Sequence, residues 1–222
     1  MAFELSPVEI EKEIKTLLMN GLLGNSKDFA AWVQMETKRK FRELPSISVE
    51  AVTELLEKLK ISGDVVSSKF DSREYTISEQ LSSTLKVINS ESYTLLGAHV
   101  FSPLQYVRSR LEYFLRRNQV SEEMTLDVSI AVIEAMENAV KYGDGEIIEI
   151  KYSLDKSKLF KISILNNIKE FNLQNDIDRG KFSSTATLMR GMMVMQKLFD
   201  KMDLDILENN KQALFTAEKK VN

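Results

Sequence analysis

Glu134 and Asn138 are the two polar side chains whose types and spacing are best suited to chemistry. They lie four residues apart in the segment Ser121–Gly143, where apolar residues recur at helical spacing, so both leave the same helix face. Lys141 continues that row one turn further on. An amide oxygen is a ligand for hard cations, and a carboxylate can receive a proton. On a mostly buried helix such a row would cost free energy without polar partners. The alternative interpretation is the solvated edge of an amphipathic helix.

The composition is that of an ordinary globular protein and excludes several kinds of site. The chain has 222 residues, enough for one large domain or two small ones. It has no cysteine, which excludes disulfides and thiolate metal sites, and its single histidine, His99, excludes a multi-histidine metal centre. The net charge of −3 gives no general attraction to nucleic acid or to an acidic membrane. No apolar run reaches the roughly 20 residues of a membrane span, and no signal peptide is visible. We therefore expect a cytoplasmic protein without a membrane partner.

The N-terminal part is predicted to hold three helices and a short hairpin. Capping serines, glycines and Pro45 divide residues 7–23, 26–42 and 46–59 into helices, and residues 64–70 and 74–77 flank a turn. This order loosely resembles a winged-helix DNA-binding module.

The charges of this part argue against DNA binding. Residues 1–88 carry 12 basic and 14 acidic side chains, a net charge of −2, and the presumed recognition helix holds Glu50, Glu54 and Glu57. A duplex binder needs clustered cations. We expect residues 1–80 to form a winged-helix-like domain that docks a partner or dimerises, and residues 78–84 to be a linker.

The C-terminal part, residues 85–222, is predicted to be an α+β domain. Strands are expected at 85–88 and 93–100, followed by a helix at 103–118 and the central helix. Two strands at 146–154 and 158–165, a polar segment, a methionine-rich helix at 185–199 and two last strands complete the order. This order predicts a two-layer α/β sandwich, with helices on one face of a largely antiparallel sheet.

The region 91–220 resembles the histidine-kinase-like ATPase fold, and within it most closely the bacterial anti-sigma-factor serine kinases. The resemblance is carried by Glu134-Ala135-Met136-Glu137-Asn138-Ala139-Val140-Lys141-Tyr142, which fits the family's N-box. It implies that Asn138 ligates a Mg²⁺ ion bridging the nucleotide phosphates. It also implies that Glu134 orients or deprotonates the attacking hydroxyl or water, and that Lys141 lies near phosphate.

Two further motifs of this family are present in altered form. Asn166-Asn167-Ile168-Lys169-Glu170-Phe171 aligns with a motif whose aspartate bonds the adenine amino group; Asn166 replaces that aspartate, and both glycines are gone. Met189-Arg190-Gly191-Met192 matches the phosphate-side motif with one of its two glycines, and the lid at 176–184 keeps only Gly180. The resemblance implies nucleotide-binding roles for Asn166, Arg190 and Gly191.

The resemblance implies a bacterial regulatory protein with an ATP-binding domain that uses ATP and Mg²⁺. It would control a protein partner, a sigma factor or an anti-anti-sigma-like domain, with or without phosphorylating serine or threonine, and it could form a homodimer. One alternative is a catalytically silent interaction module. Another is a winged-helix transcription regulator with an ATPase-like sensor domain. Because an amide both donates and accepts, Asn166 is also expected to blunt the preference for adenine over guanine.

Overall fold

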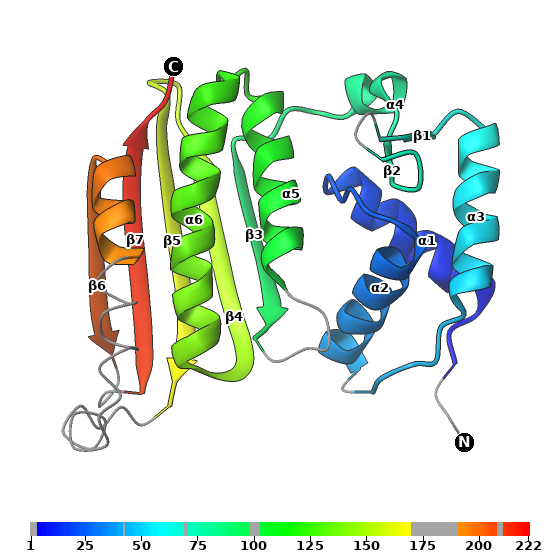
Figure 1. The fold of residues 1–222 in the computed structure, drawn as a ribbon, viewed down its shortest axis with the longest axis horizontal. Helices are drawn as coiled ribbons and strands as arrows, with labels where there is room; N and C mark the ends of the chain where they lie inside the picture. Colours follow the sequence, from blue (N-terminus) through cyan, green and yellow to red (C-terminus); the bar gives the residue numbers. More distant parts are fainter. Residues whose placement is uncertain (1–3, 42, 69–70, 98–102, 170–190, 208–210) are drawn as a thin grey trace. The chain divides into compact units, whose positions relative to one another are not determined.

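The computed structural model describes residues 4–41, 43–68, 71–97, 103–169, 191–207 and 211–222. In it the chain forms two compact units, Met1–Val87 and Ile88–Asn222. Each unit has a sheet of its own, one of two strands and one of five (Figure 1). Among the described residues, no helix is long and apolar enough to cross a membrane.

The first unit contains the three predicted helices and the predicted hairpin. Its elements are α1 (Pro7–Met19), α2 (Ser26–Phe41), α3 (Val49–Ile61), β1 (Val65–Ser67), β2 (Tyr75–Ile77) and α4 (Glu79–Thr84). The last of these corrects the sequence prediction, which made residues 78–84 a linker. The Ser78 hydroxyl accepts the Leu81 N–H, so this serine caps a short helix.

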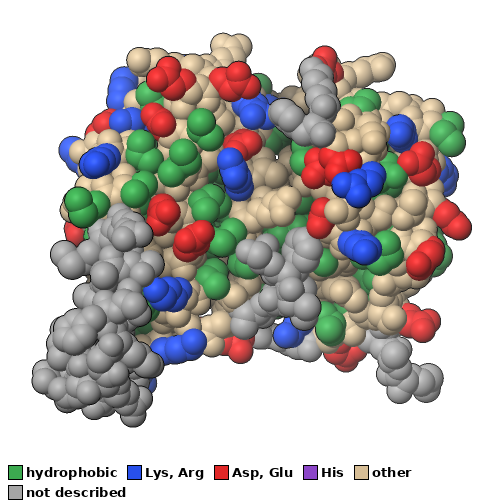
Figure 2. Space-filling view, viewed as in Figure 1, with side chains coloured by type: hydrophobic (Ala, Val, Ile, Leu, Met, Phe, Trp, Pro, Cys, Tyr) green, Lys and Arg blue, Asp and Glu red, His purple; other side chains and the backbone are tan. Residues whose placement is uncertain are grey.

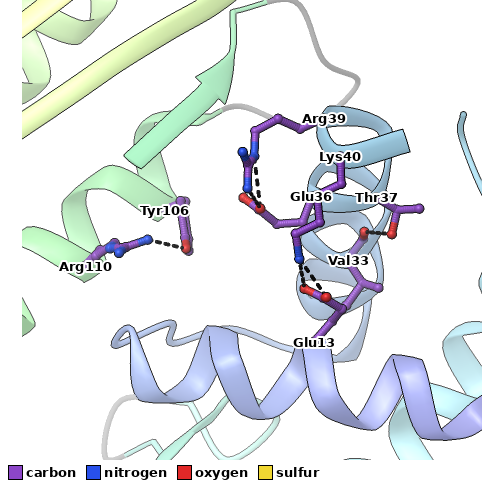
Figure 3. Close-up of polar contacts among 8 residues, drawn as sticks. All are labelled: Glu13, Val33, Glu36, Thr37, Arg39, Lys40, Tyr106 and Arg110. Atoms are coloured by element: carbon purple, nitrogen blue, oxygen red, sulfur yellow. Dashed lines mark hydrogen bonds and ion pairs between the residues drawn. The ribbon is translucent and has the colours of Figure 1, made fainter. Parts of the chain in front are cut away.

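Side-chain contacts join the elements of the first unit around an apolar core. Lys40 of α2 forms an ion pair with Glu13 of α1 at 2.7 Å (Figure 3). The Tyr75 hydroxyl of β2 donates to the Glu57 carboxylate of α3 at 2.6 Å. Burial and this carboxylate raise the pKa of Tyr75 to about 12. The core beneath these contacts includes the fully buried Ile14, Phe29, Trp32 and Leu56.

The second unit is an antiparallel five-stranded sheet with helices on one face, which confirms the predicted α+β sandwich (Figure 1). The strand order is β3-β4-β5-β7-β6. A further helix spans residues 191–198. The other elements are β3 (Ser90–Leu96), α5 (Pro103–Arg117), α6 (Glu122–Tyr142), β4 (Gly143–Leu154), β5 (Leu159–Ile168), β6 (Lys201–Leu207) and β7 (Gln212–Lys220).

The strand predicted at residues 85–88 does not form, and β3 begins only at Ser90. The Asn118 side-chain amide donates to the Ile88 carbonyl at 3.0 Å, and the Leu154 N–H donates to the Asn89 carbonyl at 2.7 Å. The chain is therefore fixed to the second unit just before its first strand begins.

The two faces of the sheet differ in polarity, as alternation along the strands requires. The face under the helices is apolar and includes Ile148, Ile150, Phe160, Ile162 and Phe215, all buried. On the opposite face the registers align two rows of polar residues across all five strands. These rows are Lys201, Glu218, Lys161, Ser153 and Ser90, and Asp203, Thr216, Ser163, Lys151 and Ser92.

Candidate functional site

Helix α6 carries Glu134 and Asn138 on a face that is neither buried nor fully exposed. The Ser121 hydroxyl accepts the Met124 N–H and caps the helix, and acidic residues in the first turn favour its N-terminus. The opposite stripe, which includes Val128, Val132 and Met136, is buried against the rest of the unit. Both polar side chains are half-buried, so they retain contact with solvent. The desolvation cost expected of a buried polar row is therefore only partial.

Gly191 brings a distant part of the chain against these two side chains. It is buried in the helix at 191–198. A β-carbon added at this position would lie 2.9 Å from Glu134 Oε2 and 3.6 Å from Asn138 Nδ2. The Glu134 carboxylate thus lies close to the backbone of Gly191, and a β-carbon at this position would push the carboxylate aside. Three residues predicted from two separate motifs are side by side in the structure.

Asn166 lies inside β5, although the sequence placed it just after the strand. It is buried, and its side-chain N–H₂ group donates to the carbonyls of Asn167 at 2.9 Å and of Ala139 at 3.4 Å. Ala139 is in the last turn of α6, so this amide links the end of that helix to the sheet. With its donors used on backbone carbonyls, the amide offers a ligand only its oxygen. The structure therefore removes the basis for the expected blunting of base preference.

Gly143 is a residue whose role the sequence did not predict. Gly143 follows the last residue of α6, but its φ is −71°, so it does not take the left-handed conformation, and the positive φ of 89° falls on Gly145. Gly143 is needed for space. A β-carbon there would lie 2.4 Å from the Ala139 carbonyl oxygen and 3.2 Å from Asn166 Nδ2. Sequence alone could not separate this requirement for close approach from a requirement for positive φ.

Lys141 is not brought into this group. Lys141 is exposed, and its ammonium lies 5.2 Å from the centre of the Tyr142 ring. Arg190 and the lid at 176–184 lie outside the described residues. No group of three or more His, Cys, Asp or Glu side chains that could hold a metal ion occurs in the described part of the chain.

A hollow of about 1040 Å³ lies elsewhere, on the outer face of the sheet. It is lined by the two polar rows described above. Its lysines are already matched by carboxylates, with Lys161 2.9 Å from Glu218 and Lys151 3.4 Å from Glu149. Since the helices and Gly191 meet on the other face, we assign this hollow to the solvated surface of the sheet.

A buried ionic cluster that the sequence did not predict lies between α5 and strands β3 and β4. Arg110 and Glu91 form an ion pair at 2.7 Å with side chains only 11% and 7% exposed. Glu91 also accepts the Tyr152 hydroxyl at 2.6 Å, and Arg110 donates to Tyr106 (Figure 3). The guanidinium carbon lies 3.9 Å from the centre of the Tyr93 ring. Burial raises the pKa of Tyr93. The only sequence signal was the spacing of Tyr106 and Arg110 on one helix face.

Comparisons with known proteins agree with this fold. A family model described as "Histidine kinase-like ATPase domain" matches residues 102–215. Comparison with curated proteins finds no match. One similar solved structure is that of the RsbU and RsbW domains of a Mycobacterium tuberculosis protein, with 13% identity and a TM-score of 0.46. The match covers 67% of this chain and 35% of that one. Another is the histidine kinase domain of a blue-light activated histidine kinase from Erythrobacter litoralis, with 12% identity, a TM-score of 0.32 and coverage of 97% and 94%.

Proposed function

Because the chain belongs to the histidine kinase-like ATPase family, we propose that its second unit binds ATP with Mg²⁺ and thereby controls a protein partner. The family membership confirms the resemblance drawn from the N-box. Nucleotide binding in this chain, the partner and the regulatory role are the proposal.

The observation that carries the proposal is the contact of Gly191 with Glu134 and Asn138. An amide side chain, a carboxylate and a buried glycine backbone meet on a half-buried surface, although they come from segments more than fifty residues apart. Backbone without a β-carbon can approach an anion closely, which suits a phosphate group. Exposed Lys141 would add positive charge one turn beyond Asn138.

The donor set fits a magnesium ion only together with a nucleotide. Mg²⁺ prefers oxygen ligands, keeps several waters and is often bound by a few protein oxygens plus substrate phosphates. Asn138 would supply one such oxygen, provided its amide turns that atom toward the ion. The ion would neutralise charge on the phosphates. The chain's own residues would hold and orient the phosphates beside the carboxylate.

Glu134 would act as the base if phosphate is transferred. A serine or threonine hydroxyl of the partner would attack the terminal phosphorus atom while its proton passes to the Glu134 carboxylate. The bond from that phosphorus to the bridging oxygen would break, and ADP would leave with the electron pair. A partner of the kind suggested by the anti-sigma-factor kinases, a sigma factor or an anti-anti-sigma-like domain, would provide the hydroxyl.

A catalytically silent interaction module is the second candidate, favoured by Asn166. Its buried amide serves the end of α6 through two backbone carbonyls, a structural role that does not require nucleotide. The motif around it has also lost its glycines. In this case the same surface would recognise a partner without chemistry.

The first unit is proposed to dock a partner or a second copy rather than DNA. The exposed face of α3 carries Glu50, Glu54 and Glu57 against Lys58 and Lys60, so it would repel phosphate backbones more than attract them. A transcription regulator of the winged-helix type would instead require DNA affinity that falls steeply with salt.

Calorimetry of ATP binding in the presence of Mg²⁺ tests the proposal. We expect wild-type protein to bind, and Asn138→Ala to weaken binding on the order of 10–100-fold, as loss of a group in a metal site does. Glu137→Ala is the matched control, because Glu137 is exposed on the neighbouring face of the same helix. Absence of binding in wild type at millimolar ATP would refute nucleotide binding and leave the interaction module.

The Glu134→Gln variant separates the two candidates. If phosphate is transferred, this variant should bind ATP as wild type does but form ADP far more slowly in a single turnover, since an amide cannot take the proton. If wild type and Glu134→Gln both bind ATP but form ADP only at the same background rate, the chain is the silent module.

A further inference from the structure

The outward-facing row of α6 is apolar where it precedes the proposed site. Leu126 and Ile130 are 48% and 40% exposed, and they lie one turn apart. The same row continues through Glu134 and Asn138, because each step is four residues. Figure 2 looks onto this side of the unit and shows hydrophobic side chains between acidic ones.

The exposure of Leu126 and Ile130 is unusual for a helix that packs on an apolar core. Thr125 and Ser129, each one position before an exposed apolar residue, are 2% and 0% exposed. Neither hydroxyl has a hydrogen-bond partner among the residues that the structure describes. The helix thus buries two polar side chains while Leu126 and Ile130 face outward, the reverse of the usual preference. Packing among the described residues of the unit does not account for the outward pair.

The surroundings of the pair are acidic. Glu122, Glu123 and Asp127 lie within one turn of Leu126, and the first two are exposed. None of the three forms a salt bridge with another described residue. An occupant of this surface should therefore combine apolar side chains with cations.

We propose that Leu126 and Ile130 dock an amphipathic helix of another protein, one with two apolar side chains a turn apart flanked by lysine or arginine. Rows of residues four apart form ridges that pack into the grooves of a second helix. A second copy of α6 fits poorly, because a two-fold contact would bring the same carboxylates together.

The position of this surface gives it a use in the proposed function. Ile130 and Glu134 are about 6 Å apart along the helix axis. A segment docked on Leu126 and Ile130 would hold its neighbouring residues close to the Glu134 carboxylate. This last step rests on the proposed function; the docking itself does not.

Fluorescence anisotropy with designed peptides tests the docking. The probe is a labelled helical peptide of about 18 residues, long enough to be helical, with leucines a turn apart and lysines beside them. A scrambled peptide of the same composition measures non-specific attraction. We expect Leu126→Ser/Ile130→Ser to weaken binding of the probe about tenfold or more. The matched control is Leu204→Ser/Ile206→Ser, which changes the exposed apolar pair of β6.

Charge reversal gives an independent measurement should the apolar substitutions disturb folding. Glu123→Lys/Asp127→Lys should weaken binding of the basic probe and strengthen binding of a probe in which glutamates replace the lysines. Equal affinity for the ordered and scrambled peptides would overturn the proposal. The proposal would also be overturned if the protein formed a concentration-dependent dimer that the Leu126→Ser/Ile130→Ser variant does not form. ATP binding by the same proteins, measured by calorimetry, keeps this result separate from the proposed function. If the protein binds ATP but does not bind the peptide, the docking is rejected and the proposed function is not.

Discussion

At the scale of single residues, Asn166 shows how a substitution in a binding motif can serve the fold. The amide hydrogens face two backbone carbonyls, one of them at the end of α6. A carboxylate has no hydrogen to offer and would meet the negative end of the helix dipole. The asparagine is therefore the better residue for this contact, whatever the residue does with a ligand.

Asn166→Asp is expected to destabilise the second unit by about 1–3 kcal/mol at neutral pH, the usual cost of an unmatched buried polar group. The pKa of the new carboxyl should be raised in the folded state, because only the protonated form can donate. The stability that this carboxyl contributes is then fully present below its pKa in the unfolded state, near 4. That stability is lost as the pH rises through its higher pKa in the folded state. Urea unfolding at pH 4 and pH 7 measures the difference.

Asn167→Asp is the matched control for this experiment. Asn167 is exposed, and its side-chain oxygen accepts from the Gln212 amide at 3.1 Å, a bond that a carboxylate can keep. Its stability should stay near wild type. A similar loss in both variants, or no loss in Asn166→Asp, would contradict the linking role of the Asn166 amide.

At the scale of elements, the contact of α5 with β3 and β4 depends on the ion pair of Arg110 with Glu91. A buried pair contributes little net stability, but removing one partner leaves the other charge unmatched, at a cost of about 3–5 kcal/mol. We expect Arg110→Leu and Glu91→Leu each to lower the free energy of unfolding by about this amount.

The double variant Arg110→Leu/Glu91→Leu should be more stable than either single variant, because it leaves neither charge buried. Arg108→Leu is the control, since Arg108 pairs with Glu112 at the surface and should change stability by less than about 1 kcal/mol. A double-variant cycle from thermal unfolding gives the coupling. Additive losses from the two single variants would show that the charges do not act as a pair.

The elements themselves were largely predictable from sequence, for physical reasons. Helix α6 has a capping serine and a regular apolar stripe, so local signals and packing agree. At residues 78–88 they do not. Ser78 caps a short helix inside a polar run whose local pattern also fits a linker. The Ile88 and Asn89 carbonyls accept from Asn118 and Leu154, and these tertiary contacts leave no local pattern.

The candidate site was predictable only where one helix carries it. The spacing of Glu134 and Asn138 follows from helix geometry, whereas their contact with Gly191 depends on how the helix at 191–198 packs. The space requirement at Gly143 and the orientation of the Asn166 amide likewise depend on backbone atoms of other elements. None of these can be read from residue types.

At the scale of the whole molecule, the two units should be energetically independent. Each has a sheet of its own and its own set of buried apolar residues. We expect residues 88–222 produced alone to keep their circular dichroism and to bind ATP within a factor of about two of the full chain, as for sites that do not share contacts. Loss of the far-ultraviolet signal, or a much lower affinity, would show that the first unit completes the second.

The fixed start of β3 has a consequence for any partner of the first unit. Helix α4 ends at Thr84, and the chain is tied to the second unit at Ile88, so few residues separate the two. A tether this short keeps one unit near the other at an effective concentration of the order of millimolar. A protein captured by the first unit would therefore meet the second as an intramolecular neighbour. Even a contact too weak to detect between separate molecules would then be populated.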